Sequence, residues 1–212
     1  MRALYPALLD LTAARILVVG GGRVALRKVE GLLAAGGRPD ILAPELTPAL
    51  EGLAASRGLT HRAAGFSDGS VRGYQLVVAA TDRAEVNARV GAEARAAGAW
   101  VNVVDDPAAS SLTVPATVRE GGVLAAVSTG GSSPLLARRV RRRLEQVVTP
   151  GLGRAATRLQ ALRGEVRKRW PDDPQQRRSF WFSLITDEFV DAAIAGRDEE
   201  VESRIEACLW QS

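Results

Sequence analysis

The sequence predicts an α/β fold in which a parallel, doubly wound sheet is followed by smaller segments. Short apolar runs alternate with helical patterns over the first half of the chain, which is the order of elements that a parallel sheet with crossover helices requires. The run 75–80 is continuously apolar after its first residue, as expected for a strand that is covered on both faces. With 212 residues, of which 46% are hydrophobic, the chain can form one full domain with a smaller appendage.

A glycine-rich turn joins the first predicted strand, 16–19, to the first helix. Gly20, Gly22 and Ala25 fit the Gly-x-Gly-x-x-Ala fingerprint of dinucleotide-binding folds. Gly20 permits a tight turn, Gly22 lets backbone N–H groups approach a pyrophosphate, and Ala25 lets the helix pack close to the sheet. The helix N-terminus adds partial positive charge where phosphates would lie. We therefore predict a Rossmann-type cofactor site, the alternative being a tight turn without a ligand.

The second predicted strand, 39–43, ends at a proline and is followed by a carboxylate. Glu45 comes about 20 residues after the glycines, where such folds place an acidic side chain on the ribose hydroxyls. A carboxylate there would repel a 2′-phosphate, which favours NAD over NADP. Alternatively, Glu45 opens the next predicted helix, 47–57.

The remaining strands of the predicted sheet are 60–63, 75–80 and 100–104, with a helix over 84–97. His61, the only histidine, is expected to be structural. Ligands of parallel sheets bind outside the carboxyl ends of the strands. One crevice is therefore expected to gather the residues that follow those ends: Gly20 to Val24, Glu45, Thr81, Asp82 and Asp105.

The pattern changes after Pro107, because no helix fits between the apolar runs 111–118 and 122–127. We predict that these two strands are antiparallel and joined at 120–122. Ser133 and Pro134 are expected to start the next helix. That helix carries an apolar stripe and an arginine cluster, made of Leu136, Val140, Leu144 and Val147 and of Arg138, Arg139 and Arg141 to Arg143. A break at 149–151 precedes a helical remainder, 154–210, which is interrupted at 171–174.

Charge and composition exclude several classes of protein. The net charge of +4, from 28 basic and 24 acidic residues, suits an anionic small ligand as well as nucleic acid, but aromatic residues are scarce before Trp170. We therefore expect no nucleic-acid binding. No apolar run reaches about 18 residues, so no membrane partner is expected. A single cysteine, Cys208, excludes an internal disulfide and a cysteine metal cluster. We expect a cytoplasmic protein without a metal site.

Four segments resemble the siroheme synthase family, whose members are precorrin-2 dehydrogenases that stand alone or are fused to a methyltransferase. They occur in the order and at the spacing of that family and together cover residues 1 to about 150. The C-terminal helices match only in kind and length. The four segments are 18–28, 79–82 with Val86 and Asn87, 102–107 and 126–137.

The resemblance implies oxidation of precorrin-2 to sirohydrochlorin with NAD, and in some members the insertion of ferrous iron. It also implies a Rossmann domain over 1–113, a dimerisation segment over 114–150 that forms a homodimer, and a C-terminal helical domain over 151–212. Asp105 is implied as the catalytic aspartate. Whether this chain also inserts iron stays open. The residues implied or expected to bind the cofactor are Gly20, Gly22, Arg23, Val24, Pro44, Glu45, Thr81 and Asp82.

The implied substrate is a tetrapyrrole with many carboxylates, which requires cations and hydrogen-bond donors. The loop 128–133 offers hydroxyls and N–H groups at a helix start. The arginine cluster offers guanidinium groups for carboxylates, although a run of charges is usually a solvated face. Thr129 and Asp106 depart from the usual family pattern. The expected substrate-binding residues are Asn102, Ser128, Thr129, Gly130 and Ser132.

Three alternatives compete with this interpretation. In the first alternative, Asp105 simply starts a turn before Pro107. The whole chain could be a non-catalytic NAD-binding regulatory module, which would share the glycine turn but would need neither 102–105 nor the loop 128–133. A basic DNA-binding regulator is disfavoured, because no helix-turn-helix pattern lies near the arginine cluster.

Overall fold

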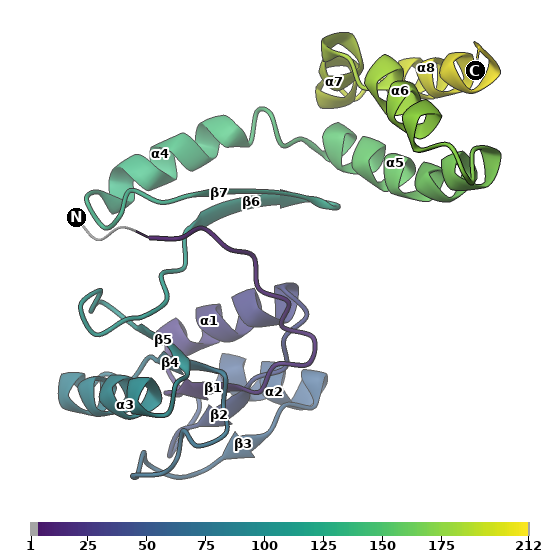
Figure 1. Cartoon of the computed structure of the whole chain (residues 1–212). Helices are drawn as coiled ribbons and strands as arrows, with labels where there is room; N and C mark the ends of the chain where they lie inside the picture. Colours follow the sequence, from purple (N-terminus) through teal and green to yellow (C-terminus); the bar gives the residue numbers. More distant parts are fainter. Residues whose placement is uncertain (1–3, 212) are drawn as a thin grey trace. The chain divides into compact units, whose positions relative to one another are not determined.

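A computed structural model of the chain describes residues 4–211. The chain divides into two compact units, an amino-terminal unit that ends at Val114 and a carboxy-terminal unit that begins at Pro115 (Figure 1). The predicted division into 1–113, 114–150 and 151–212 stays a prediction. No helix of the described residues combines the length and apolar character needed to cross a membrane.

The amino-terminal unit is a five-stranded parallel sheet in the order β3-β2-β1-β4-β5. The strand order reverses between β1 and β4, which is the switch point where open α/β sheets bind ligands. The predicted doubly wound α/β fold is confirmed. The strands are β1 (Ile16–Val19), β2 (Asp40–Leu42), β3 (His61–Arg62), β4 (Leu76–Ala79) and β5 (Trp100–Val103); the helices are α1 (Arg23–Ala34), α2 (Pro48–Arg57) and α3 (Ala84–Ala96).

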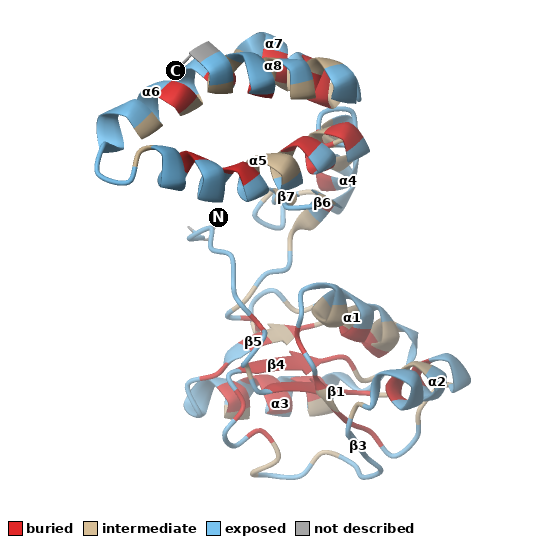
Figure 2. Cartoon of the chain, turned by 90° about the vertical axis from the view of Figure 1, so that its right-hand side faces the viewer, coloured by how far each residue is buried: buried red, intermediate tan, exposed pale blue. Residues whose placement is uncertain are grey.

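Both faces of this sheet are buried, so its central strands carry no polar face (Figure 2). On one face Leu17 and Val77 pack with Val90 of α3. On the other face Val18 packs with Val29 of α1, together with residues of α2. This alternation follows from the two-residue period of a strand. It explains why the strands are apolar without interruption.

The carboxy-terminal unit begins with an antiparallel hairpin and continues with helices. Helix α4 packs against both strands of the hairpin. The buried core of the last four helices includes Leu162, Phe180, Phe189 and Ile205. The elements are β6 (Ala116–Glu120), β7 (Val123–Val127), α4 (Pro134–Leu144), α5 (Pro150–Arg169), α6 (Pro174–Leu184), α7 (Asp187–Ile194) and α8 (Asp198–Gln211).

Two predicted boundaries in this region were wrong. The strand expected from Ser111 begins at Ala116, because the N–H groups of Ser111 and Leu112 donate to the carbonyl of Val101 and hold this stretch beside β5. The expected break at 149–151 is a helix start, since the Thr149 hydroxyl accepts the Leu152 N–H and caps α5. The pair Thr-Pro is a typical N-cap and first helical residue.

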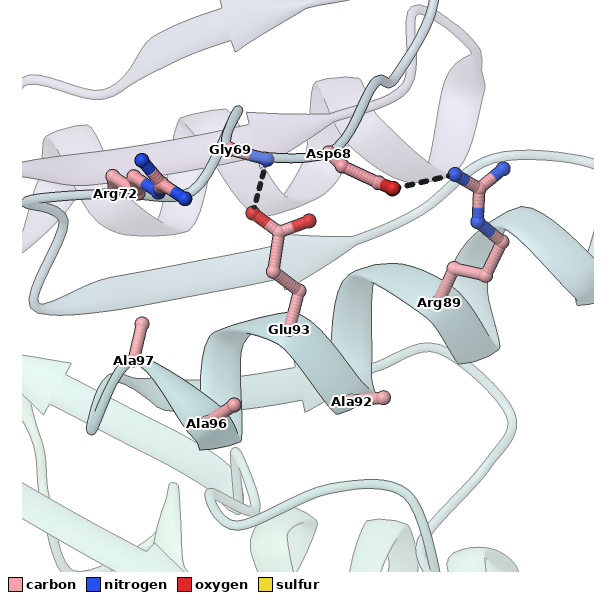
Figure 3. Close-up of a pocket in the computed structure, with 8 residues that line it drawn as sticks. All are labelled: Asp68, Gly69, Arg72, Arg89, Ala92, Glu93, Ala96 and Ala97. Carbon is pink, nitrogen blue, oxygen red and sulfur yellow. Dashed lines mark hydrogen bonds and ion pairs between the residues drawn. The ribbon is translucent and has the colours of Figure 1, made fainter.

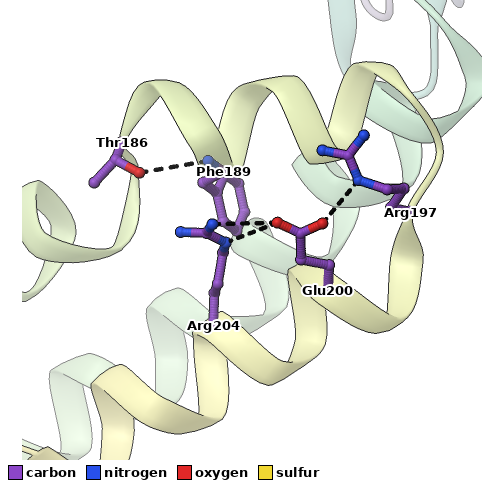
Figure 4. A network of polar contacts seen from close by, with 5 residues as sticks. All are labelled: Thr186, Phe189, Arg197, Glu200 and Arg204. Carbon is purple, nitrogen blue, oxygen red and sulfur yellow. Dashed lines mark hydrogen bonds and ion pairs between the residues drawn. The ribbon is translucent and has the colours of Figure 1, made fainter.

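Polar contacts lie at the start of α7 and over the first turns of α8 (Figure 4). Glu200 accepts hydrogen bonds from Arg197 and Arg204, and these bonds lower the pKa of its carboxyl group. The Thr186 hydroxyl accepts the Phe189 N–H and caps α7. Ion pairs between exposed side chains add little to stability, because solvent and salt screen them. The apolar core, rather than these contacts, therefore holds the helices together.

Candidate functional site

The glycine turn brings the ends of three strands into contact. Gly20 has φ +129°, and a β-carbon there would overlap the carbonyl oxygen of Ala80 after β4. A β-carbon at Gly21 would overlap the carbonyl oxygen of Glu45 after β2. The Gly21 carbonyl also accepts the Thr47 N–H at 2.9 Å. Only glycine fits positions 20 and 21, so the turn is shaped by close backbone packing.

The third glycine faces open space. Gly22 is the N-cap of α1, and no side chain caps this helix end. A β-carbon at Gly22 would meet no atom within 4 Å. Arg23 is exposed, whereas Val24 is half-buried and packs against the apolar core. An uncapped helix N-terminus with room in front of it fits the pyrophosphate of a dinucleotide.

The loop after β2 lies beside this turn. Pro44 and Glu45 are exposed, and the Glu45 carbonyl faces Gly21. Helix α2 begins at Pro48 with Thr47 as its N-cap residue, so Glu45 does not open that helix. His61 contacts the Ala43 carbonyl oxygen through Nε2 at 2.9 Å, which gives the only histidine a contact within the fold. Glu45 thus lies in the loop after β2, beside the glycine turn, and its contact with a ribose stays a prediction.

The loop after β4 is held by Asn87, whose role the sequence did not reveal. The N–H and hydroxyl of Thr81 donate to Asn87 Oδ1 at 3.0 and 2.7 Å. Asn87 Nδ2 returns a bond to the Thr81 carbonyl at 3.0 Å. These three hydrogen bonds let Asn87 fix the loop after β4, which lies next to the glycine turn. The Thr81 hydroxyl is thereby engaged within the fold. Asp82 is exposed beside it.

Asp105 follows β5 and has an unusual backbone. Its φ of +59° is the only positive value at a non-glycine residue in the part of the chain that the structure describes. Such conformations cost about 1–3 kcal/mol and cluster at functional sites. Its exposed carboxylate makes no hydrogen bond to any described residue.

The turn that carries Asp105 is fixed by its neighbours. Asp106 Oδ1 accepts the Ala109 N–H at 2.9 Å. The buried Ser110 hydroxyl donates to the Asp106 carbonyl at 2.8 Å and accepts the Val103 N–H at 2.9 Å. Asp106 thus serves as the turn residue and leaves the carboxylate of Asp105 unengaged.

Lys28 and Asn102 form a contact that sequence reasoning missed. Lys28 Nζ donates to Asn102 Oδ1 at 2.7 Å, and Asn102 Nδ2 donates to the Leu112 carbonyl at 3.2 Å. Burial lowers the pKa of Lys28, the charge of Arg27 lowers it further, and the charge of Asp105 opposes this. The available signal was the position of Lys28, three residues after Ala25 and so on the buried side of α1.

The loop 128–133 belongs to the carboxy-terminal unit and is internally bonded. The Thr129 hydroxyl accepts the Ser133 N–H and donates to the Ser133 carbonyl, both at 3.1 Å. The Ser128 hydroxyl accepts the Gly130 N–H at 3.2 Å, and the Ser132 N–H donates to the Thr129 carbonyl. Ser133 caps α4 through the Leu136 N–H, as predicted. The substrate-binding roles of this loop stay predictions.

The predicted site residues do not coincide with the surface cavity that lies in the amino-terminal unit. A surface cavity of about 520 Å³ lies beside α3, but none of the predicted site residues line it (Figure 3). In that cavity Arg89 pairs with Asp68 at 2.7 Å, and Glu93 accepts the Gly69 N–H. No group of three or more His, Cys, Asp or Glu side chains within the described range is arranged to hold a metal ion.

Three family models match the chain in succession. The family described as "Putative NAD(P)-binding" matches residues 7–116. "Sirohaem biosynthesis protein central" matches residues 126–146, and "Sirohaem synthase dimerisation region" matches 151–209. The region named for dimerisation thus corresponds to the helices α5 to α8.

The chain is also similar to curated proteins and to a solved structure. It is 43% identical over 207 residues to siroheme synthase of Chromobacterium violaceum, covering 96% of this chain and 44% of that protein. It is 40% identical over 204 residues to siroheme synthase of Ectopseudomonas mendocina, with the same coverage. The chain thus spans under half the length of these relatives. A structure named "SirC, precorrin-2 dehydrogenase" shares the fold, with a TM-score of 0.78 and 24% identity over 96% of this chain and 100% of that chain. The chain therefore belongs to the siroheme synthase family and carries its NAD(P)-binding, central and dimerisation regions.

Proposed function

We propose that the chain oxidises precorrin-2 to sirohydrochlorin with NAD as the electron acceptor. The observation that carries this proposal is the unengaged carboxylate of Asp105, held in a strained conformation at the sheet edge that also bears the glycine turn. Backbone conformations of this kind cluster at active sites and ligand clamps. The names of the relatives and of the structural neighbour support the same activity.

The oxidation of precorrin-2 needs one proton acceptor from the chain. The oxidation removes two hydrogens from the macrocycle: one leaves with its bonding electron pair and reduces NAD⁺ to NADH, and the other leaves as a proton. Asp105 accepts that proton and passes it to solvent, since its exposed carboxylate has no competing hydrogen bond among the described residues. General-base help of this kind contributes about 10²–10⁴-fold in rate.

The cofactor is held by the glycine turn and its neighbours. Gly22 and the uncapped N-terminus of α1 receive the pyrophosphate, and Glu45 accepts hydrogen bonds from the ribose. A carboxylate in that place repels a 2′-phosphate. We therefore propose NAD rather than NADP.

The carboxylate of Glu45 is expected to set this preference. Changing Glu45→Gln removes a charge next to the 2′ position, so the Kd for NADPH should fall about fivefold or more while the Kd for NADH changes little. Fluorescence titration of both reduced cofactors measures this. Glu51→Gln, which removes an equally exposed carboxylate from α2, is the matched control. Equal affinity of the unaltered chain for NADH and NADPH would contradict the proposal.

The direct test supplies precorrin-2, generated in situ, with NAD and without metal, and follows the absorbance of sirohydrochlorin. We expect product that depends on NAD. Binding of NAD without turnover would contradict the proposed enzyme activity and favour a regulatory module. A second incubation with ferrous iron, added as a substrate, shows whether iron insertion follows.

We further propose a homodimer. Helix α4 exposes apolar side chains that a second copy of the chain would cover: Leu135 is 55% and Leu136 is 52% exposed, and Val147 beyond the helix is 47% exposed. Large exposed apolar patches on soluble proteins mark interaction surfaces. The match of residues 151–209 to a region named for dimerisation supports the same state. We also propose that the protein is cytoplasmic, because its one cysteine suits a reducing compartment.

A further inference from the structure

We propose that Lys28 anchors a carboxylate of the substrate at the carboxyl end of β5, and that Asn102 positions Lys28 for this task. The inference rests on the proposed function, because it takes the ligand to be the carboxylated macrocycle. It assigns to Lys28 the substrate contact that the sequence suggested for Asn102.

The ammonium group of Lys28 is fixed in place by a contact between distant elements. Lys28 lies on α1 and Asn102 on β5, and their side chains meet at 2.7 Å in a partly buried position. The amide of Asn102 is itself held, since its Nδ2 donates to the Leu112 carbonyl. Both ends of that amide are therefore engaged within the fold. Asn102 acts as a tether for the lysine rather than as a ligand.

The lysine retains donors and charge that the fold does not use. An ammonium group has three N–H donors, and Asn102 is its only hydrogen-bond partner among the described residues. No carboxylate of the described chain lies within ion-pair distance of it, although Asp105 is close enough to act on its pKa. Lysine is rarely buried without an anionic partner, because removing a cation from water is costly, and Lys28 is half-buried with only a neutral amide beside it. An anionic ligand would supply the missing partner.

The position of Lys28 favours the macrocycle over the cofactor. The phosphates of a dinucleotide belong at Gly22, before the first turn of α1, whereas Lys28 lies six residues further along the chain, in the second turn of that helix. Glu45, which marks the adenosine side, follows β2, and Asn102 lies on β5 beyond β1 and β4. A cation beside Asp105 therefore meets the molecule that is oxidised, and the macrocycle provides carboxylates there.

The test is the steady-state kinetics of Lys28→Met, which keeps the apolar stem and removes the charge. The KM for precorrin-2 should rise roughly ten- to hundredfold, as for loss of a charge-assisted hydrogen bond. The kcat should stay within about twofold of the unaltered chain, because an interaction made equally in the ground and transition states affects KM alone. Lys28→Arg should restore part of the affinity. Arg27→Met, an exposed cation next to it on the same helix, is the matched control and should change neither constant.

Other outcomes overturn the proposal. A fall in kcat with unchanged KM would make Lys28 a positioning residue for Asp105, and a weaker Kd for NADH would make it a cofactor residue. A readout without turnover is the quenching of tryptophan fluorescence by uroporphyrin, a stable carboxylate-rich macrocycle, and equal quenching of variant and unaltered chain would contradict the anchor. This binding measurement still decides the role of Lys28 if the unaltered chain fails to oxidise precorrin-2. Lys28→Gln, which keeps a donor for Asn102, replaces the methionine variant if that one does not fold.

Discussion

Replacing Asp105 with asparagine is expected to lower the kcat for precorrin-2 oxidation by about 10²–10⁴-fold, with the Kd for NADH unchanged. Asparagine has nearly the same shape and also tolerates positive φ, so the turn should form as before. Alanine would remove the base equally well, but it would also add backbone strain at φ +59°. The asparagine variant therefore separates loss of the proton acceptor from loss of the fold. Stopped-flow or steady-state absorbance of sirohydrochlorin measures the change.

Asp106→Asn provides the control for this substitution. The Asp106 side chain accepts the Ala109 N–H, and an asparagine oxygen can accept the same bond. This variant should keep kcat within about threefold, because it removes a charge next to Asp105 without removing the base. If Asp105→Asn turns over as fast as the unaltered chain, Asp105 is not the base. The strain at this residue would then belong to the turn alone.

The fold could be predicted because local and global signals agree in the amino-terminal unit. Strands β1 and β4 are apolar runs that end at glycine or polar residues, and α1 starts within a motif whose spacing is tied to its geometry. The prediction failed where tertiary contacts override local pattern. The apolar run from Ser111 looks like a strand, but its N–H groups donate to Val101 and bring it to the edge of β5.

The sequence predicts which residues follow the carboxyl ends of the strands, but it does not predict which side chains contact each other there. That Glu45 and Gly21 meet follows from topology, since β1 and β2 are neighbours. The pairing of Lys28 with Asn102 joins residues 74 positions apart, and no period or motif specifies it. The positive φ of Asp105 is equally invisible in the sequence, because aspartate adopts both signs and the surrounding turn decides.

Gly20→Ala and Gly22→Ala alter the same turn but are expected to have different effects: the first lowers stability and the second weakens NADH binding. Alanine at position 20 would be forced to φ +129° and would overlap the Ala80 carbonyl. Backbone strain alone should lower the free energy of unfolding by about 1–3 kcal/mol, and the steric overlap adds to it. Alanine at position 22 has an ordinary φ of −87° and no atom within 4 Å. It should cost less than about 1 kcal/mol.

Gly22→Ala is expected to weaken cofactor binding with little loss of stability. The methyl group of Gly22→Ala enters the space that we assign to the pyrophosphate, so the Kd for NADH should rise at least about tenfold in a protein that unfolds at nearly the unaltered Tm. Thermal unfolding and NADH titration on each variant separate the two effects. Gly52→Ala, at an open position within α2, is the control and should raise stability by up to about 1 kcal/mol without touching NADH affinity. Unchanged NADH binding by Gly22→Ala would place the dinucleotide elsewhere, and the open space before α1 would then require another ligand.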